Sequence, residues 1–123
     1  MATVQFTRND VSGDGTAFLY TWVLGNADDG VPIGLNPKDL QFSDCCFSCE
    51  GTIGGATIVF EGTNGSSYAT LNNVQGTAIT GVAVIPPKQV VEVPLLRRPR
   101  TSGGLTTSLT CYALVRRQQP ARL

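Results

Sequence analysis

At 123 residues the chain has the length of one domain, and it can bury a continuous core without a metal ion or disulfide to support it. Its hydrophobic content of 41% is typical of a globular domain, and it lacks the long apolar run that a transmembrane helix requires. The formal net charge is zero, although residues 1–87 hold two basic and eight acidic side chains and residues 88–123 hold seven basic and one acidic.

This uneven charge along the chain has two interpretations. A polar split can orient a protein on a partner or pair two copies of it. Alternatively, the two halves neutralise each other in the fold. The imbalance is too small to argue for nucleic acid, so we expect neither a nucleic-acid partner nor a membrane partner. Because the start of the chain, MATVQFTRND, lacks the features of a secretory signal, we expect folding in a cytosol, where disulfides are disfavoured.

Short segments of strand character follow one another along the chain, and no segment of a dozen residues keeps a helical period without a Gly or Pro. Thr16–Leu24 is apolar on both of its faces, which predicts burial between two layers. Val31–Asp39 contains two prolines and is expected to be an edge strand or an irregular crossing. The other predicted strands are Thr3–Thr7, Leu40–Glu50, Ala56–Gly62, Tyr68–Leu71, Thr77–Ile85, Gln89–Leu95 and Thr106–Arg116.

Turn sequences rich in Gly, Asn and Asp separate these strands. The clearest are Ser12–Gly15, Gly54-Gly55 and the hairpin sequence Asn64-Gly65-Ser66. Eight or nine short strands with such punctuation predict an all-β fold, a single-domain antiparallel β-sandwich of jelly-roll or immunoglobulin-like kind. We expect this domain to span residues 1–117 and a polar tail to occupy residues 118–123.

The sequence contains little that indicates catalysis. Histidine is absent, which removes the commonest general base and the commonest metal ligand. A glycosidase needs two carboxylates across a cleft, and Glu50 and Glu61 are candidates because they flank one turn. We interpret them instead as solvated surface carboxylates, and we expect a protein that is not an enzyme and uses no cofactor.

Three cysteines are crowded together, and the fourth, Cys111, is distant in sequence. Cys46-Phe-Ser-Cys49 matches the C-x-x-C pattern of redox and zinc sites. Because side chains alternate along a strand, however, Cys46 and Cys49 are expected to point to opposite faces, and Cys45 and Cys49 to share one. We therefore predict packed, reduced thiols without zinc, with metal or redox use as the alternative.

Basic residues gather near the last predicted strand. Few aromatic residues lie among them, whereas single-stranded nucleic acid is bound by stacking on such residues. Arginine forms bidentate pairs with carboxylates, so we predict an interface with an acidic protein surface or a sister copy, with ordinary solvated arginines as the alternative. Replacement of Arg97, Arg98 and Arg100 by Ser should leave folding nearly intact, because exposed ion pairs contribute only about 0–1 kcal/mol each. The predicted interface residues are Arg97, Arg98, Arg100, Arg116 and Arg117.

Several strings resemble a family of small virion proteins of tailed bacteriophages. The main one is GGATIVFEGTNGSSYATL at residues 54–71, where a GG turn precedes a strand and an aromatic residue precedes a "TL" strand. Further similar strings are Thr21–Gly30, Asn73–Thr80, Arg98-Pro99 ahead of Thr101–Gly104, and the terminal Arg116-Arg117. The resemblance covers roughly residues 16–117; the chain differs in its Cys-Cys-x-x-Cys segment and in lacking an Asp between Asn64 and Gly65.

The resemblance implies a capsid decoration or cement protein with a jelly-roll type sandwich. Such a protein binds the outer surface of the capsid and cements major capsid subunits together. Its expected partners are the major capsid protein and sister copies, as a homodimer in preference to a trimer. The alternative function is a virion-surface module that binds a carbohydrate or receptor, which exposed aromatic side chains would support. Tyr20 and Trp22 lie within a predicted strand and are expected to belong to the core instead.

Overall fold

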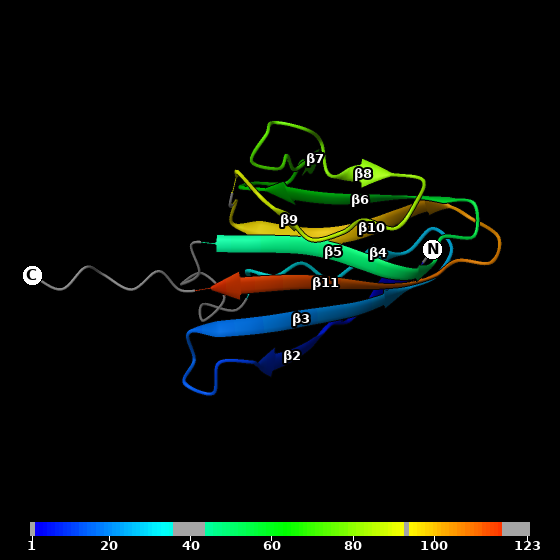
Figure 1. Cartoon of the computed structure of the whole chain (residues 1–123). Coiled ribbons are helices and arrows are strands. Elements are labelled where there is room, and N and C mark those ends of the chain that lie inside the picture. Colours follow the sequence, from blue (N-terminus) through cyan, green and yellow to red (C-terminus); the bar gives the residue numbers. More distant parts are fainter. Residues whose placement is uncertain (1, 36–43, 93, 117–123) are drawn as a thin grey trace, which may run out of the picture.

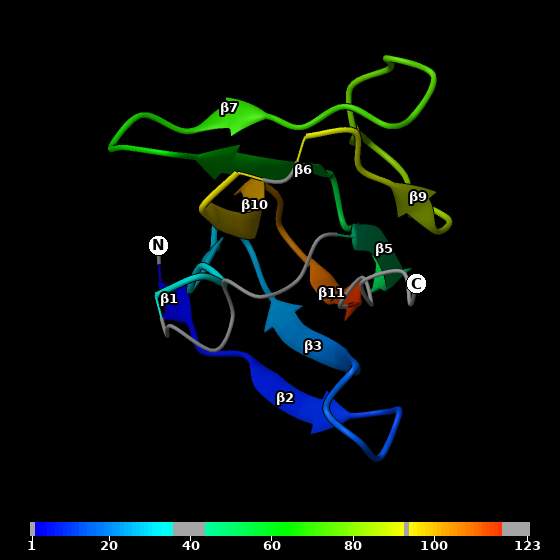
Figure 2. The same cartoon turned by 90° about the vertical axis from the view of Figure 1, so that its left-hand side faces the viewer.

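The computed structural model describes residues 2–35, 44–92 and 94–116, and every regular element within these ranges is a β-strand. The strands form two sheets that face each other across a shared core (Figure 1). Figure 2 shows the same two layers in a view turned by 90°. The predicted all-β sandwich is therefore confirmed, whereas its assignment to the jelly-roll type stays a prediction.

The first sheet, sheet A, contains the strongly basic strand. Neighbouring strands are antiparallel except for the first two, and the central pair, β10 and β6, is joined over eight residues of each strand. β8 (Thr80–Gly81) also pairs with β6. The order across the sheet is β1 (Thr3–Val4), β4 (Asp29–Gly30), β10 (Leu96–Gly103), β6 (Ala56–Thr63) and β7 (Ala69–Thr70).

The second sheet, sheet B, is antiparallel throughout and has the last strand of the chain at its centre. This central strand pairs over its length with one strand from the start of the chain and one from the middle. The order across the sheet is β2 (Thr7–Asp10), β3 (Ala17–Leu24), β11 (Ser108–Arg116), β5 (Asp44–Thr52) and β9 (Lys88–Gln89).

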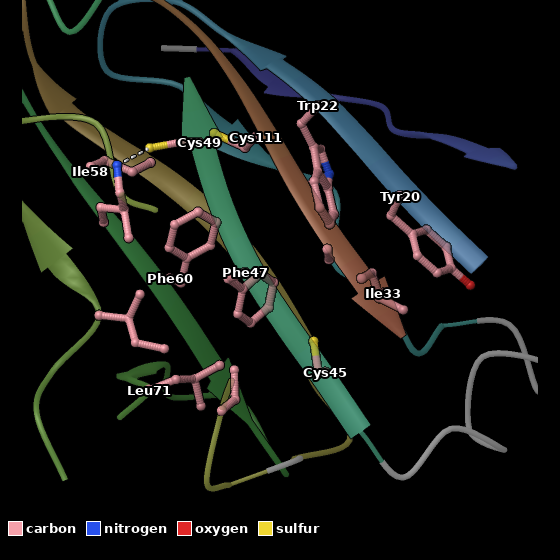
Figure 3. Packing of buried hydrophobic residues seen from close by; sticks show 14 of the residues in the cluster. Tyr20, Trp22, Ile33, Cys45, Phe47, Cys49, Ile58, Phe60, Leu71 and Cys111 are labelled. Carbon is pink, nitrogen blue, oxygen red and sulfur yellow. Dashed lines mark hydrogen bonds between the residues drawn. The ribbon is translucent and has the colours of Figure 1, made fainter. Parts of the chain in front are cut away.

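The core lies between the sheets and is built from alternating positions of the long strands, as a half-buried sheet requires. Tyr20 and Trp22 are fully buried, as predicted, and the Trp22 Nε1 atom donates a hydrogen bond of 2.9 Å to the Val31 carbonyl. Phe47 of sheet B stacks on Phe60 of sheet A with 4.6 Å between ring centroids (Figure 3). Aromatic contacts of this kind therefore join the two sheets.

Two predicted turns have the expected positions. In the turn between β5 and β6, Gly54 and Gly55 have φ angles of 59° and 84°, which favour glycine. A Cβ on Gly54 would lie 2.4 Å from the Thr106 carbonyl carbon, so this turn also needs a residue without a side chain. Residues 64–68 connect β6 to β7, which pair antiparallel, so the predicted hairpin is confirmed.

Other predicted strands are wrong in extent or in burial. Of Thr77–Ile85 only the two residues Thr80–Gly81 form a strand, and of Gln89–Leu95 only Gln89 belongs to one, the two-residue strand Lys88–Gln89. The prediction that both faces of β3 are buried is also wrong, because Val23 is 57% exposed on the side of sheet B that faces away from the core. The predicted strand Leu40–Glu50 begins in residues outside the described ranges.

Candidate interaction site

The arginines of β10 alternate between the two faces of sheet A. Within Leu96–Gly103, Arg97, Pro99 and Thr101 point into the sandwich and are buried, whereas Arg98 and Arg100 lie on the outer face. This alternation follows directly from strand geometry. The three arginines, which are nearly consecutive in sequence, therefore have two different environments.

Arg97 is not a surface residue, and its prediction as an interface residue is wrong. Its side chain lies in the core and is only 2% exposed. Its Nε and Nη1 atoms make no hydrogen bond within the described part of the chain, although the guanidinium hydrogen-bonds the Cys45 thiol. Burial raises the pKa of Cys45 to about 12, against the opposing effect of the Arg97 charge. The thiol is therefore neutral and does not compensate the charge of the arginine.

Arg98 and Arg100 bind a carboxylate of the same chain. Both Nε atoms donate to Glu61 Oε1 of the neighbouring strand β6, at 2.9 and 3.1 Å. Arg98 also lies 3.9 Å from the Asp29 carboxylate, and its guanidinium packs on the Tyr68 ring at 3.8 Å from the centroid. The Nε donors of both arginines are thus occupied by a carboxylate of the same chain. These contacts stabilise sheet A, and they leave the two arginines less available to a partner.

Arg116 is the predicted interface residue that remains exposed. It ends β11 and lies opposite Asp44 of β5 in the register of sheet B. Arg117, also predicted, lies outside the described residues. The structure therefore does not bring the predicted arginine set together on one surface: one member is in the core, two are on sheet A and one is on sheet B.

The side of sheet B that faces away from the core carries a feature that sequence reasoning missed. Leu114 lies between Leu19 and Cys46 in the strand register, and all three are half-buried, while Val23 on the same face is 57% exposed. We call Leu19, Val23, Cys46 and Leu114 the outer row. In the sequence, the second apolar face of β3 indicates this surface, but that face was predicted to be buried in the core.

Polar groups border the outer row and also interrupt it, because the pair Thr21 and Tyr112 lies in the register between Val23 and the row's other three members. Beside it, the Tyr112 hydroxyl donates a hydrogen bond of 2.7 Å to the exposed Glu50 carboxylate, which raises the pKa of Tyr112. At one end, a shallow cavity of about 210 Å³ is lined by Asp44, Gln89, Leu114 and Arg116, among others. An apolar centre with a charged and hydroxyl-bearing border is the usual composition of a protein-binding surface.

The two carboxylates considered for glycoside hydrolysis do not form a catalytic pair. Glu50 projects from the outer face of sheet B, and Glu61 from the outer face of sheet A, with the core between them. The interpretation of Glu61 as a solvated carboxylate is also wrong, because it is 5% exposed and paired with two arginines. Glu61 is buried because the side chains of Arg98 and Arg100 and the strands β7 and β10 on either side of β6 cover it.

The cysteines follow the predicted alternation. Cys45 and Cys49 point into the core, and Cys46 lies on the outer face, where burial raises the pKa of its thiol. Cys111 is also buried and lies directly opposite Cys49. Within the described ranges, no three His, Cys, Asp or Glu side chains gather closely enough to hold a metal ion.

Comparison with known proteins adds no relative to this description. No family model, curated protein or solved structure matches the chain. In the part of the chain that the structure describes, there is also no helix long and apolar enough to cross a membrane. A functional argument for this chain therefore rests on its sequence strings and on its own surface.

Proposed function

We propose that this chain is a structural virion protein that docks on the outer surface of a bacteriophage capsid and joins neighbouring major capsid subunits. In this proposal it is made in the host cytoplasm, carries out no catalysis and acts by binding alone. The sequence strings at residues 54–71 and around them support the phage assignment, since they resemble small virion proteins. The jelly-roll type remains part of this proposal.

The observation that carries the docking proposal is the outer row of sheet B. Its side chains come from the three central strands of sheet B, so a partner can bury them without reordering a loop. The charges of Arg116 and Asp44 at one end of the outer row orient the partner on this surface. Arg98 and Arg100 remain paired with Glu61. Each copy bridges several capsid subunits at once, so that many modest contacts sum to strong binding through avidity.

The alternative of a carbohydrate- or receptor-binding module has less support. Carbohydrate sites commonly use exposed aromatic rings, and both Tyr20 and Trp22 are fully buried. The partly exposed ring of Tyr112, beside Glu50 on the outer face of sheet B, is the observation that bears on this alternative. Its direct test is the first part of the experiment below, because a receptor-binding module can be present on a virion at low copy number and away from the capsid shell.

The experiment begins with gradient-purified particles of the phage that encodes the chain. We expect the chain in amounts comparable to the major capsid subunit, with density on the outer face of the shell by cryo-electron microscopy. Absence from particles, or a position only on the tail, contradicts the proposal.

A matched pair of variants then tests the outer row. Val23→Lys introduces a charge into the outer row, whereas Val82→Lys makes the same change at a residue that is 74% exposed and directly follows β8 of sheet A. When re-added to stripped capsids, Val23→Lys should bind at least about tenfold more weakly, because a lysine must be desolvated in the interface. Val82→Lys should bind like the unaltered chain. Equal binding of both variants excludes the outer row as the docking surface.

A further inference from the structure

Two buried thiols face each other across neighbouring strands of sheet B. Cys49 of β5 and Cys111 of β11 are direct partners in the strand register, and they are 5% and 0% exposed. The two side chains are hydrogen-bonded to each other. Figure 3 shows both sulfur atoms on the core side of the sheet. The residues lie 62 positions apart in sequence, so only the fold brings them together.

The backbone around Cys49 shows which kind of strand pair this is. The Cys49 N–H donates to the Ile85 carbonyl at 3.0 Å, and the Cys45 carbonyl accepts from the Val90 N–H at 2.9 Å. These groups of β5 therefore point away from β11, which makes Cys49 and Cys111 a non-hydrogen-bonded pair. In such pairs the Cα atoms are about 4.5 Å apart. Disulfides span Cα separations of about 4.4–6.8 Å, so a disulfide fits here at the short end of the range.

Cys49 is the better nucleophile of the two. Its sulfur accepts hydrogen bonds from the Ile85 N–H, at 3.3 Å, and from the Cys111 thiol. These bonds lower the pKa of Cys49 to about 7, whereas burial and donation to Cys49 raise the pKa of Cys111. Burial raises the pKa of Cys45 and of Cys46 as well. Thiolate character at neutral pH is thus concentrated on one sulfur that has a second thiol beside it.

A surface cavity reaches one member of this pair, Cys49. A surface cavity of about 290 Å³ is lined by Cys49 together with Glu50, Ile85, Pro86 and Tyr112, among others. A hydroperoxide is small enough to enter a cavity of this size, whereas a large disulfide must displace the Ile85–Pro87 segment. The geometry thus combines a reactive sulfur that lines a surface cavity with a resolving thiol beside it, and both features are typical of an oxidation site.

We propose that Cys49 and Cys111 form an oxidation site in which a hydroperoxide converts the dithiol into a cross-strand disulfide. The Cys49 thiolate attacks one oxygen of hydrogen peroxide, the O–O bond breaks, and the hydroxide that leaves takes up a proton to become water. The sulfur of Cys111 then attacks the Cys49 sulfenic acid, the S–O bond breaks, and the second hydroxide takes the Cys111 proton. Two thiols are oxidised by two electrons, and one peroxide is reduced to two waters.

The bond would join β5 to β11 covalently and close the chain segment that contains β6 to β10. Closing a long loop restricts the unfolded chain and therefore stabilises the folded one. Strain in a short cross-strand disulfide opposes this stabilisation and makes the disulfide easier to reduce. The chain made in a reducing cytosol would carry four free thiols and acquire the bond after exposure to an oxidising medium. This inference holds whether or not the chain docks on a capsid.

The test uses the intact folded chain, hydrogen peroxide and intact-mass measurement. We expect the loss of two hydrogen atoms, a linked pair of peptides that contain Cys49 and Cys111, and two thiols that remain titratable in denaturant. Dithiothreitol should restore all four thiols. The reaction rate should rise with pH through about 7, as the Cys49 thiolate forms, and the midpoint of thermal unfolding should rise by several degrees.

Four single variants make this test specific. Cys49→Ala and Cys111→Ala should not lose two hydrogen atoms, whereas Cys45→Ala and Cys46→Ala should still do so. If a variant fails to fold, the peptide map of the unaltered chain decides alone. A link between any other two cysteines, oxygen addition at Cys46 without a link, or four free thiols after peroxide treatment that oxidises free cysteine overturns the proposal.

Discussion

Arg97 places a positive charge in the core without a carboxylate beside it in the described part of the chain. Burial of a charge costs free energy unless an opposite charge compensates it, and the Cys45 thiol that hydrogen-bonds this guanidinium is neutral. An apolar side chain of similar length removes that cost and keeps most of the packing. We therefore predict that Arg97→Met leaves the free energy of unfolding unchanged or raises it by about 1–4 kcal/mol.

Urea denaturation of both proteins measures this difference. Arg97→Ala is the control, because it removes the same charge but leaves a cavity, and it should be less stable than Arg97→Met by about 2–5 kcal/mol. A loss of more than about 1 kcal/mol in Arg97→Met would show that the guanidinium has a stabilising partner.

Which side chains point inward could be predicted from the sequence only where one alternating set is apolar. In β5 the set Cys45, Phe47 and Cys49 is apolar, and its inward direction was predicted. In β10 one set contains Arg97, Pro99 and Thr101, and the other contains Leu96, Arg98 and Arg100, so hydrophobicity does not choose between them. The pairing of Cys49 with Cys111 was equally inaccessible, because register between distant strands depends on the whole topology.

At the scale of elements, the ladder between β6 and β10 depends on the pairing of Glu61 with two arginines. Glu61 is 5% exposed, so removal of both arginines leaves a buried carboxylate without its charge partners. The prediction from the sequence that these arginines can be replaced with little loss of stability therefore does not hold for Arg98 and Arg100. We predict that Arg98→Met with Arg100→Met lowers the free energy of unfolding by about 2–3 kcal/mol, less than the 3–5 of a fully buried pair because Arg100 is partly exposed.

The control for this prediction is Glu61→Gln in the same double variant. It removes the uncompensated charge and should restore at least about 1 kcal/mol, as measured by chemical denaturation in a double-mutant cycle. If Glu61→Gln destabilises the double variant further, the carboxylate is stabilised by other groups, and the role assigned to the arginines is wrong.

The long strands were easier to predict than the short ones. β3 and β6 are long, strongly apolar segments, β11 alternates between buried and partly exposed residues, and all three have clear turn residues next to them. The region from Asn72 to Glu92 was predicted to hold two long strands, yet several of its backbone N–H groups donate to side chains of the same region. Asn73 accepts from the backbone of Gln75 and Thr77, and Glu92 accepts from the Asn72 backbone. Such local bonds compete with a strand ladder and are not visible in an apolar pattern.

For the whole molecule, the topology largely removes the charge split seen along the sequence. β10 carries Arg98 and Arg100 from the basic part of the chain, and it lies between β4 and β6 from the acidic part. These strands supply the acidic partners Asp29 and Glu61. β11 likewise lies between β3 and β5 and brings Arg116 opposite Asp44. Of the two interpretations of the split, the described residues support mutual neutralisation.

Association of copies should therefore depend on apolar contacts and little on charge. We predict that the chain forms a dimer through a two-fold contact, the commonest arrangement in soluble oligomers. Its dissociation constant should change by less than about threefold between about 0.05 and 0.5 M salt, because screening in this range weakens exposed charge pairs and leaves apolar burial intact. Sedimentation equilibrium at both salt concentrations measures this constant, and Arg116→Ser should leave it unchanged. Dissociation as salt rises would show that exposed charges hold the copies together, and a monomer at every concentration would exclude self-association.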